Sequence, residues 1–230
     1  MLKIEDIHTY YGDSHILHGV SLEVGQAEVI GILGRNGRGK TTLFRSVLGI
    51  TPPRSGRVSF QNIEITNKQP YEIARLGIGL VPQGRQIFPS LSVLENLTVG
   101  FKGGSSDWTL EKIYELFPPL SERETHPGNK LSGGEQQMLA IGRSLMTNPS
   151  LLLMDEPTAG LSPVFVKTVG QVIRELQRTG ISILLVEQNL RFALEHANYI
   201  HFMARGTIAY SSHPQELEEN HEIISRYLGV

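Results

Sequence analysis

The residues best suited to chemistry form one glycine-rich run, Gly34-Arg35-Asn36-Gly37-Arg38-Gly39-Lys40-Thr41-Thr42. The run contains the pattern G-x-x-x-x-G-K-[ST], in which glycines let successive backbone N–H groups curl around phosphate oxygens. A helix that starts after the run adds its positive end to the attraction for an anion. We expect an exposed Lys40 that reaches the β- and γ-phosphates of a nucleotide, and a Thr41 hydroxyl that binds Mg²⁺. Arg38 either approaches the nucleotide or points to solvent, and we favour solvent.

A second candidate group is a pair of acids at the end of an apolar run, Leu151-Leu152-Leu153-Met154-Asp155-Glu156. Adjacent residues at a strand end point in different directions, so the two carboxylates can serve different roles. We expect Asp155 to hold Mg²⁺ through water and Glu156 to polarise an attacking water. Alone, the pair reads as a strand-end cap, but together with the phosphate loop it indicates a nucleotidase.

A third group, Leu131-Ser132-Gly133-Gly134-Glu135-Gln136, precedes an expected helix. Ser132 and Glu135 have the spacing of a capping box, in which each side chain accepts a hydrogen bond from the other's backbone. The two glycines leave backbone N–H groups accessible at the positive helix end, which makes an anion-binding surface. In isolation a structural cap and an anion site are equally good interpretations.

The elements that must position these groups alternate in a regular way. Apolar or alternating runs predict early strands at 2–10, 16–24 and 27–33, followed by a helix at 40–48. Later strands at 151–154, 181–186 and 199–203 alternate with helices at 164–178 and 190–197, which favours a parallel sheet. A single helix from Pro214 to Leu228 is expected to close the chain.

The middle of the chain has a different character from its two ends. Helices are expected at 109–117 and 135–146, separated by a stretch rich in proline and glycine. We interpret residues 84–149 as a helical subdomain inserted into a nucleotide-binding α/β core made of residues 1–83 and 150–230. The whole chain, 1–230, is then a single domain.

Composition excludes several classes of protein. The 230 residues carry a net charge of -2 and no cysteine, so disulfides and cysteine-ligated metals are ruled out. The near-neutral charge argues against a nucleic-acid partner. No apolar run approaches the roughly 20 residues that span a bilayer. The eight histidines lack metal-ligand spacing, and we expect them at the surface or in loops.

The sequence resembles the ABC ATPase family over essentially its whole length. The resemblance rests on GRNGRGKTT, LSGGEQQ and LLLMDEP, together with Gln83 at the glutamine loop and Tyr11 at the aromatic that stacks on adenine. It implies a P-loop NTPase cassette with a parallel-sheet, RecA-like core, an N-terminal antiparallel β subdomain and an inserted helical subdomain. A core role for Tyr11 and a plain loop role for Gln83 are the alternatives.

The resemblance also implies partners. Two ATPase subunits, identical or different, would bind ATP and Mg²⁺ head to tail, with residues 131–136 of one subunit completing the site of the other. Gln83 would join the Mg²⁺ site to the helical subdomain, which docks on a membrane-spanning permease. The chain would then be peripheral on the cytoplasmic face of the membrane, and a substrate-binding protein would act indirectly from the other side.

One position departs from the family pattern, because Gln188 stands where most members place a histidine that contacts the γ-phosphate. Glutamine donates a hydrogen bond but carries no charge, so we expect Gln188 to act in catalysis without titrating. The surrounding string Glu187-Gln188-Asn189 resembles importers of branched-chain amino acids. In contrast, Tyr10-Tyr11-Gly12 and the run at 81–85 resemble the urea or short-amide branch.

We favour the amino-acid group and keep the urea branch as the alternative. A lipid or lipopolysaccharide export motor fits less well, because its family usually keeps the histidine. A non-transport ABC protein usually has two cassettes or long coiled coils, and an unrelated phosphate-loop kinase or GTPase would lack LSGGE.

Overall fold

An antiparallel sheet forms the N-terminal part of the computed structural model, which describes residues 1–101, 107–218 and 221–228. Its strand order is β2-β1-β4-β5. The bounds are β1 (Leu2–Tyr11), β2 (Ser14–Val24), β4 (Ser55–Phe60) and β5 (Ile63–Glu64). Alternating side chains of β1 and β2 are buried on one face, which is the pattern of a sheet with one face on a core.

A second sheet has the order β10-β9-β3-β8-β7-β6, in which only β10 runs antiparallel to its neighbour. The bounds are β3 (Val29–Leu33), β6 (Ile78–Val81), β7 (Leu151–Asp155), β8 (Ser182–Glu187), β9 (Tyr199–Ala204) and β10 (Thr207–Ser212). Parallel strands are covered on both faces, which explains their unbroken apolar runs. The register pairs Leu33 with Glu187 and Asp155 with Val186, so the carboxyl ends of β3, β7 and β8 meet at one edge.

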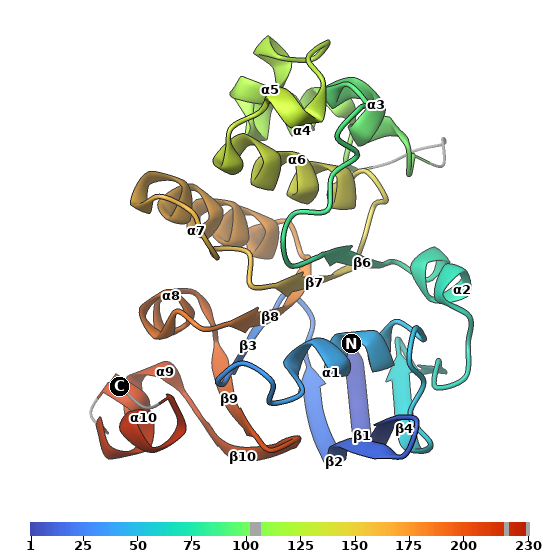
Figure 1. Cartoon of the computed structure of the whole chain (residues 1–230), viewed down its shortest axis with the longest axis vertical. Helices are drawn as coiled ribbons and strands as arrows, with labels where there is room; N and C mark the ends of the chain where they lie inside the picture. Colours follow the sequence, from blue (N-terminus) through green and yellow to red (C-terminus); the bar gives the residue numbers. More distant parts are fainter. Residues whose placement is uncertain (102–106, 219–220, 229–230) are drawn as a thin grey trace.

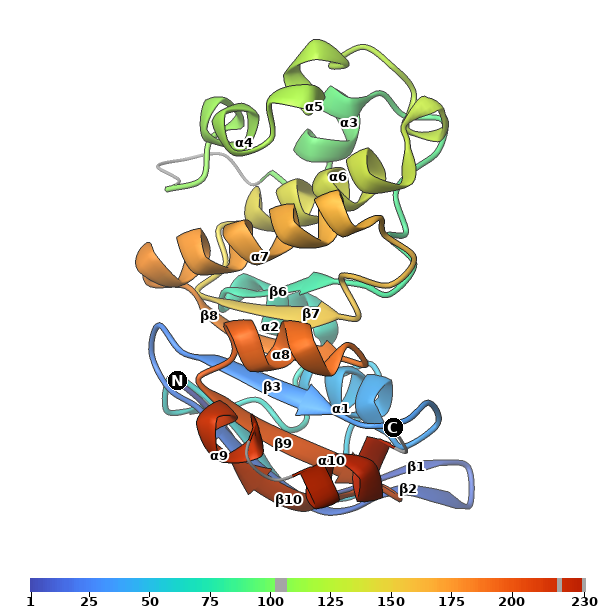
Figure 2. The same cartoon turned by 90° about the vertical axis from the view of Figure 1, so that its left-hand side faces the viewer.

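Helices cover both faces of this second sheet. Helix α1 (Lys40–Val47) lies between the two sheets, where Leu43, Phe44 and Val47 join an apolar cluster with side chains of both. Helix α7 (Pro163–Arg178) covers the other face beside α8 (Leu190–His196), as Figures 1 and 2 show. Its buried side chains Val169, Val172, Ile173 and Leu176 recur at helical spacing, so one stripe of α7 faces the core.

The helices of the middle segment gather at one end of the molecule, beyond α7 (Figure 1). They are α3 (Val93–Thr98), α4 (Leu110–Leu116), α5 (Pro118–Glu122) and α6 (Gly133–Leu145), with a 3₁₀ turn at Gly128–Lys130. The expected helices at 109–117 and 135–146 are therefore present, with bounds that differ by one or two residues. Helices α2 (Pro70–Arg75), α3 and α5 were not predicted.

At the end of the chain, where one helix is expected from Pro214 to Leu228, the described residues are helical in α9 (Pro214–Glu218) and in α10 (His221–Leu228). Residues 219–220 between them lie outside the described residues. Within the described ranges, no helix combines the length and the apolar character needed to cross a bilayer.

Among the histidines whose burial the structure describes, two are buried, so the expectation that all eight lie at the surface or in loops is wrong. His196 packs edge-on against Phe192 in α8 and so closely against α7 that a Cβ at Gly170 would lie 2.3 Å from its Nε2. His201 lies in β9, where its Nδ1 is 2.7 Å from the Ser211 Oγ. Burial lowers the pKa of His201 to about 4, because charging the ring would place an ion in the core.

Candidate functional site

The phosphate loop connects the end of β3 to the start of α1. Gly37 and Gly39 have φ angles of 73° and 103°, a region that favours glycine, and α1 begins directly after Gly39. Gly34 passes so close to β9 that a Cβ would lie 2.4 Å from the Met203 carbonyl oxygen. Arg35, Asn36 and Arg38 line a cavity of about 450 Å³ with Gln188. The loop therefore has the backbone shape and the positive surroundings of an anion site.

Lys40 is buried, with only 4% of its surface exposed, so the expectation of an exposed lysine is wrong. Its Nζ donates to the carbonyl oxygens of Gly34 at 2.6 Å and Arg35 at 3.2 Å. The same ammonium is 3.5 Å from Glu156 Oε1. The glycine-rich loop wraps around its own lysine and satisfies the ammonium group, which would be costly to bury without partners.

Asp155 and Thr41 lie together where the metal is expected. Burial raises the pKa of Asp155, and the nearby Thr41 hydroxyl opposes this effect only in part. Asp155 Oδ1 is buried and has no hydrogen-bond partner among the residues that the structure describes. A hydroxyl and a carboxylate with an unsatisfied oxygen are ligands that Mg²⁺ prefers, so the residues fit this ion.

Glu156 is the meeting point of the polar side chains. Its Oε2 accepts hydrogen bonds from Gln83 Nε2 at 2.8 Å and from Gln188 Nε2 at 2.6 Å. Its backbone has a φ of 50°, which is left-handed and strained for a residue with a side chain, and its N–H is held by the Val186 carbonyl at 2.9 Å. This conformation turns Glu156 to a different side from Asp155 and places it among Lys40, Gln83 and Gln188.

Tyr11 ends β1 and has 43% of its surface exposed, so the alternative of a plain core aromatic is wrong. The guanidinium carbon of Arg45 in α1 lies 6.0 Å from the centre of the Tyr11 ring. The exposed ring has a surface available for stacking, close to the helix that follows the phosphate loop.

The start of α6 has the predicted capping box. Ser132 N donates to Glu135 Oε2 at 2.7 Å and Glu135 N donates to Ser132 Oγ at 3.4 Å. Burial raises the pKa of Glu135, but its bonds to Ser132 and Arg123 outweigh this effect and hold the pKa below the ordinary value. Leu131 is buried beside this cap, and Gln136 Nε2 donates to the Gly128 carbonyl at 3.2 Å.

Both glycines of this helix start are in tight contacts. A Cβ at Gly134 would lie 2.3 Å from ring atoms of Phe165 in α7, and one at Gly133 would lie 3.0 Å from the Arg85 guanidinium. Arg85 Nη1 also donates weakly to Gln136 Oε1 at 3.4 Å. The contacts of Arg85 with the start of α6 were not predicted. The available signal was the position of this cation, two residues after Gln83.

The predicted residues therefore fall into two groups. Lys40, Gln83, Glu156 and Gln188 are in contact through the bonds given above, and the Thr41 hydroxyl lies near Asp155. The start of α6 is not part of this group, because α6 and α1 lie on opposite sides of β6 and β7 (Figures 1 and 2). A single chain thus separates two anion-binding features.

Glu187 is a polar residue whose contacts were not predicted. It ends β8 with 2% of its surface exposed, and its oxygens accept bonds from Thr158, Gln188 and Asn189. An acid that ends an apolar strand directly before a candidate catalytic residue was the available signal. The partner Thr158 comes from another strand end, which the sequence alone does not reveal.

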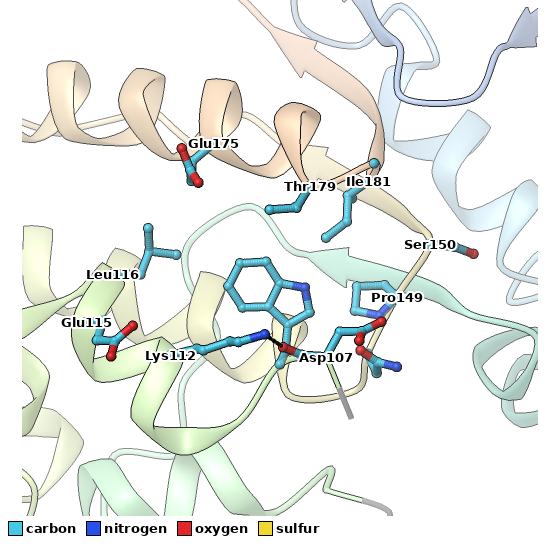
Figure 3. Close-up of a pocket in the computed structure, with 12 residues that line it drawn as sticks. Asp107, Lys112, Glu115, Leu116, Pro149, Ser150, Glu175, Thr179 and Ile181 are labelled. Atoms are coloured by element: carbon cyan, nitrogen blue, oxygen red, sulfur yellow. Dashed lines mark hydrogen bonds between the residues drawn. The ribbon is translucent and has the colours of Figure 1, made fainter. Parts of the chain in front are cut away.

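A larger cavity, of about 710 Å³, lies between α4 and the end of α7 (Figure 3). Lys112 and Glu115 of α4 lie across it from Glu175 of α7 and from Thr179, which directly follows that helix. Ser150, which lines this cavity, precedes β7, whereas Asp155 ends the same strand. The larger cavity is therefore at the opposite edge of the sheet from the phosphate loop, and the placement of polar groups locates the site better than volume does.

Comparisons with known proteins agree with this geometry. The family model described as ABC transporter matches residues 17–159. The chain is 39% identical over 232 residues to the high-affinity branched-chain amino acid transport ATP-binding protein BraG of Pseudomonas aeruginosa, with both chains covered in full. It is 31% identical to the lipopolysaccharide export system ATP-binding protein LptB of Haemophilus influenzae, over 100% of this chain and 97% of that one.

Solved structures show the same architecture. A nucleotide-free ATP-binding cassette from an ABC transporter is similar with a TM-score of 0.85 and 34% identity, covering 96% of this chain and 94% of that chain. A dimeric cassette in a post-hydrolysis state, bound to ADP and phosphate, has a TM-score of 0.80 and 28% identity, covering 93% and 99%.

The fold and the site thus define an ATP-binding cassette. The chain belongs to the ABC transporter family, and it is the ATPase subunit that couples ATP hydrolysis to transport.

Proposed function

We propose that this chain is the ATP-hydrolysing motor of an importer for branched-chain or related amino acids. The identity of 39% to a branched-chain amino acid transport protein, against 31% to a lipopolysaccharide export protein, supports this substrate class. An importer of urea or short amides is the second candidate, favoured by the motifs at Tyr10-Tyr11-Gly12 and at 81–85.

The observation that carries the catalytic part of the proposal is the set of contacts around Glu156. Gln83 and Gln188 both donate to one carboxylate oxygen, while Lys40 approaches the other. A carboxylate oriented in this way is suited to polarise the water that attacks the γ-phosphate. Lys40 would exchange a loop carbonyl for phosphate oxygens when ATP binds, and residues Gly34 to Thr42 would hold the phosphates through backbone N–H groups.

Thr41 and Asp155 would hold Mg²⁺, with Gln83 beside them. When bound, the ion neutralises charge on the β- and γ-phosphate oxygens. The unsatisfied Asp155 Oδ1 supports this assignment, because a buried carboxylate oxygen of a native protein normally has a partner. Tyr11 would stack on the adenine ring through its exposed face.

The start of α6 would act on the ATP of a second ATPase subunit, either identical or different. Its capped N-terminus offers the backbone N–H groups of Gly133 and Gly134, and Arg85 adds a positive charge beside them. The separation of α6 from α1 supports a site completed by two chains. In this arrangement ATP joins the subunits and hydrolysis releases them.

An apolar groove is the surface that we propose for the permease. Its volume is about 560 Å³, and Ile50, Phe88 and Val99 line it with large exposed apolar side chains. The groove also includes Gln86, which follows the catalytic loop of Gln83, so its occupant would be coupled to the ATP site. A segment of a membrane-spanning subunit bound there would place the chain at the cytoplasmic face as a peripheral subunit, with a substrate-binding protein acting indirectly.

The Glu156→Gln variant tests the catalytic proposal. It keeps the shape of the side chain but removes the base, so hydrolysis should fall by about 10²- to 10⁴-fold. ATP binding should persist and trap an ATP-bound dimer, measured by size-exclusion chromatography with ATP. The exposed Glu122→Gln serves as the control and should hydrolyse ATP normally. Hydrolysis at the wild-type rate in the Glu156 variant would remove Glu156 from the role of base.

Uptake measurements test the substrate. In cells that lack the gene, the wild-type chain should restore uptake of labelled leucine, and the Glu156→Gln variant should not. Restoration of urea uptake with no effect on leucine would replace the first candidate by the second.

A further inference from the structure

The carboxylate of Glu187 connects two loops at the carboxyl edge of the parallel sheet. Its Oε1 accepts from Thr158 N at 3.0 Å and from Thr158 Oγ1 at 2.7 Å. Its Oε2 accepts from Gln188 N at 3.1 Å and from Asn189 N at 3.3 Å. One buried side chain thus binds the loop after β7 through one oxygen and the loop after β8 through the other.

The two loops carry the proposed catalytic groups. Thr158 is two residues after Glu156, and Gln188 follows Glu187 directly. The side chains of Glu156 and Gln188 meet at 2.6 Å. A shift of either loop would change this distance, because Glu187 binds the backbone N–H of Gln188 itself and Glu156 is two residues from Thr158.

To bind both loops, the side chain at position 187 must accept hydrogen bonds at both of its terminal atoms. The four bonds come from three backbone N–H groups and one hydroxyl, and no ion pair of Glu187 occurs among the described residues. Burial raises the pKa of Glu187, and the bonds from Thr158, Asn189 and Gln188 oppose that effect. A glutamine would direct its NH₂ group at one of the two loops, where backbone N–H groups already point inward.

We infer that Glu187 is a positioning residue for ATP hydrolysis, which holds Gln188 in the orientation that meets Glu156. The inference rests on the proposed roles of Glu156 and Gln188. A residue that only stabilised the fold would affect stability but would not depend on the side chain of Gln188. A positioning role and a purely stabilising role can therefore be told apart by the energetic coupling between Glu187 and Gln188.

A double-mutant cycle in the full chain measures this coupling. The Glu187→Gln variant should lower the single-turnover rate of Mg²⁺-ATP hydrolysis about tenfold, as expected for lost hydrogen bonds to a charged group. The KM for ATP should change by less than about twofold, because the phosphate loop is not altered. In a chain that already carries Gln188→Ala, the same Glu187→Gln change should lower the rate by less than about twofold.

Thr158→Val is the second variant, and it decides the question if the Glu187 variants do not fold. It removes the 2.7 Å hydroxyl bond but keeps the backbone bond, so the rate should fall by about two- to fivefold and again depend on Gln188. Thermal unfolding and binding of a fluorescent ATP analogue show whether each variant is folded. A half-buried threonine of α7, changed in Thr168→Val, is the matched control.

A wild-type rate in Glu187→Gln overturns the inference, and so does a loss of equal size with and without the Gln188 side chain. Failure of the catalytic proposal itself is distinguishable, because it would appear as undiminished hydrolysis by Glu156→Gln. If Glu156→Gln is inactive and the cycle shows no coupling, only the role of Glu187 is wrong.

Discussion

The phosphate loop and the start of α6 are both helix N-termini with glycines, yet they differ in their polar contacts. At the phosphate loop, Lys40 bonds to loop carbonyls and approaches Glu156, and Glu156 in turn accepts from two glutamines. At α6, the cap is closed by Ser132 and Glu135 within the same turn. The first region has groups for chemistry, whereas the second has a preformed surface for binding.

The two regions behave differently when ATP binds. Lys40 and Glu156 are satisfied by contacts that a phosphate and a water can replace, so this region has to exchange partners. The start of α6 keeps its geometry through packing, since Gly134 leaves no room between α6 and Phe165. Substitutions at the first region should therefore change binding and hydrolysis, and those at the second should change assembly.

The largest effect is expected for Lys40→Ala. Loss of a cation that bonds to phosphate should weaken ATP binding by about 100-fold, as is typical of a charge-assisted contact. A titration with a fluorescent ATP analogue measures the affinity, and the exposed Lys112→Ala is the control. Affinity within twofold of the wild type would show that Lys40 stays bound to its own loop in the ATP complex.

A packing change at α6 should have the next largest effect. A methyl group in Gly134→Ala would lie 2.3 Å from Phe165 ring atoms, so the free energy of unfolding should fall by about 1–3 kcal/mol. Gly134→Ala should also reduce ATP-dependent dimer formation. Adding Phe165→Ala should restore it, because the smaller side chain makes room for the methyl group. If the double variant dimerises no better than Gly134→Ala, close packing is not the reason for glycine at this position.

Acid should weaken the sheet that carries the phosphate loop, through His201. Its pKa is about 4 in the folded chain and 6.5 in the unfolded one, so the unfolded state binds more protons between these values. The stability that the neutral, buried His201 contributes is fully present above pH 6.5 and is lost as the pH falls through about 4. It should amount to about 2 kcal/mol between pH 7 and pH 5.

Chemical denaturation at a series of pH values measures this contribution. The His201→Gln variant keeps a hydrogen-bonding group opposite Ser211 but does not titrate, so its stability should depend less on pH. If the free energy of unfolding of the wild type and of His201→Gln changes equally between pH 5 and pH 7, the assignment to His201 is wrong.

The smallest effect is expected for Gln188→His. Histidine can also donate a hydrogen bond to Glu156, so hydrolysis at neutral pH should stay within about threefold of the wild type or rise. The variant should add a titration near pH 6.5 that the wild type lacks, visible in the pH profile of the single-turnover rate. Complete loss of hydrolysis would show that the role given to Gln188 is wrong.

The sequence predicted the features that depend on local pattern. The apolar run Leu151–Met154 lies in a buried strand, and the spacing of Ser132 and Glu135 gave the start of α6. Helices α2, α3 and α5 have five or six residues, too few for a helical period to stand out. Strand boundaries and caps are local properties, so they can be read along the chain.

The features that were missed depend on contacts between distant segments. Lys40 is buried because the loop carbonyls and Glu156 close around it, which no residue pattern indicates. Glu187 contacts Thr158 only because β7 pairs with β8. His201 is buried because β9 pairs with β3 inside the sheet. Such contacts can be identified only when the three-dimensional structure is known.

A mixing experiment tests the site shared between two chains most directly. Lys40→Ala alters the phosphate loop and Ser132→Arg alters the start of α6, so each chain alone should be inactive. In a mixture, half of the dimers contain both chains and one of their two sites is intact, so about a quarter of the wild-type ATPase rate should return. If the wild-type chain hydrolyses ATP alone and the mixture stays inactive, the site is not shared and the account is wrong.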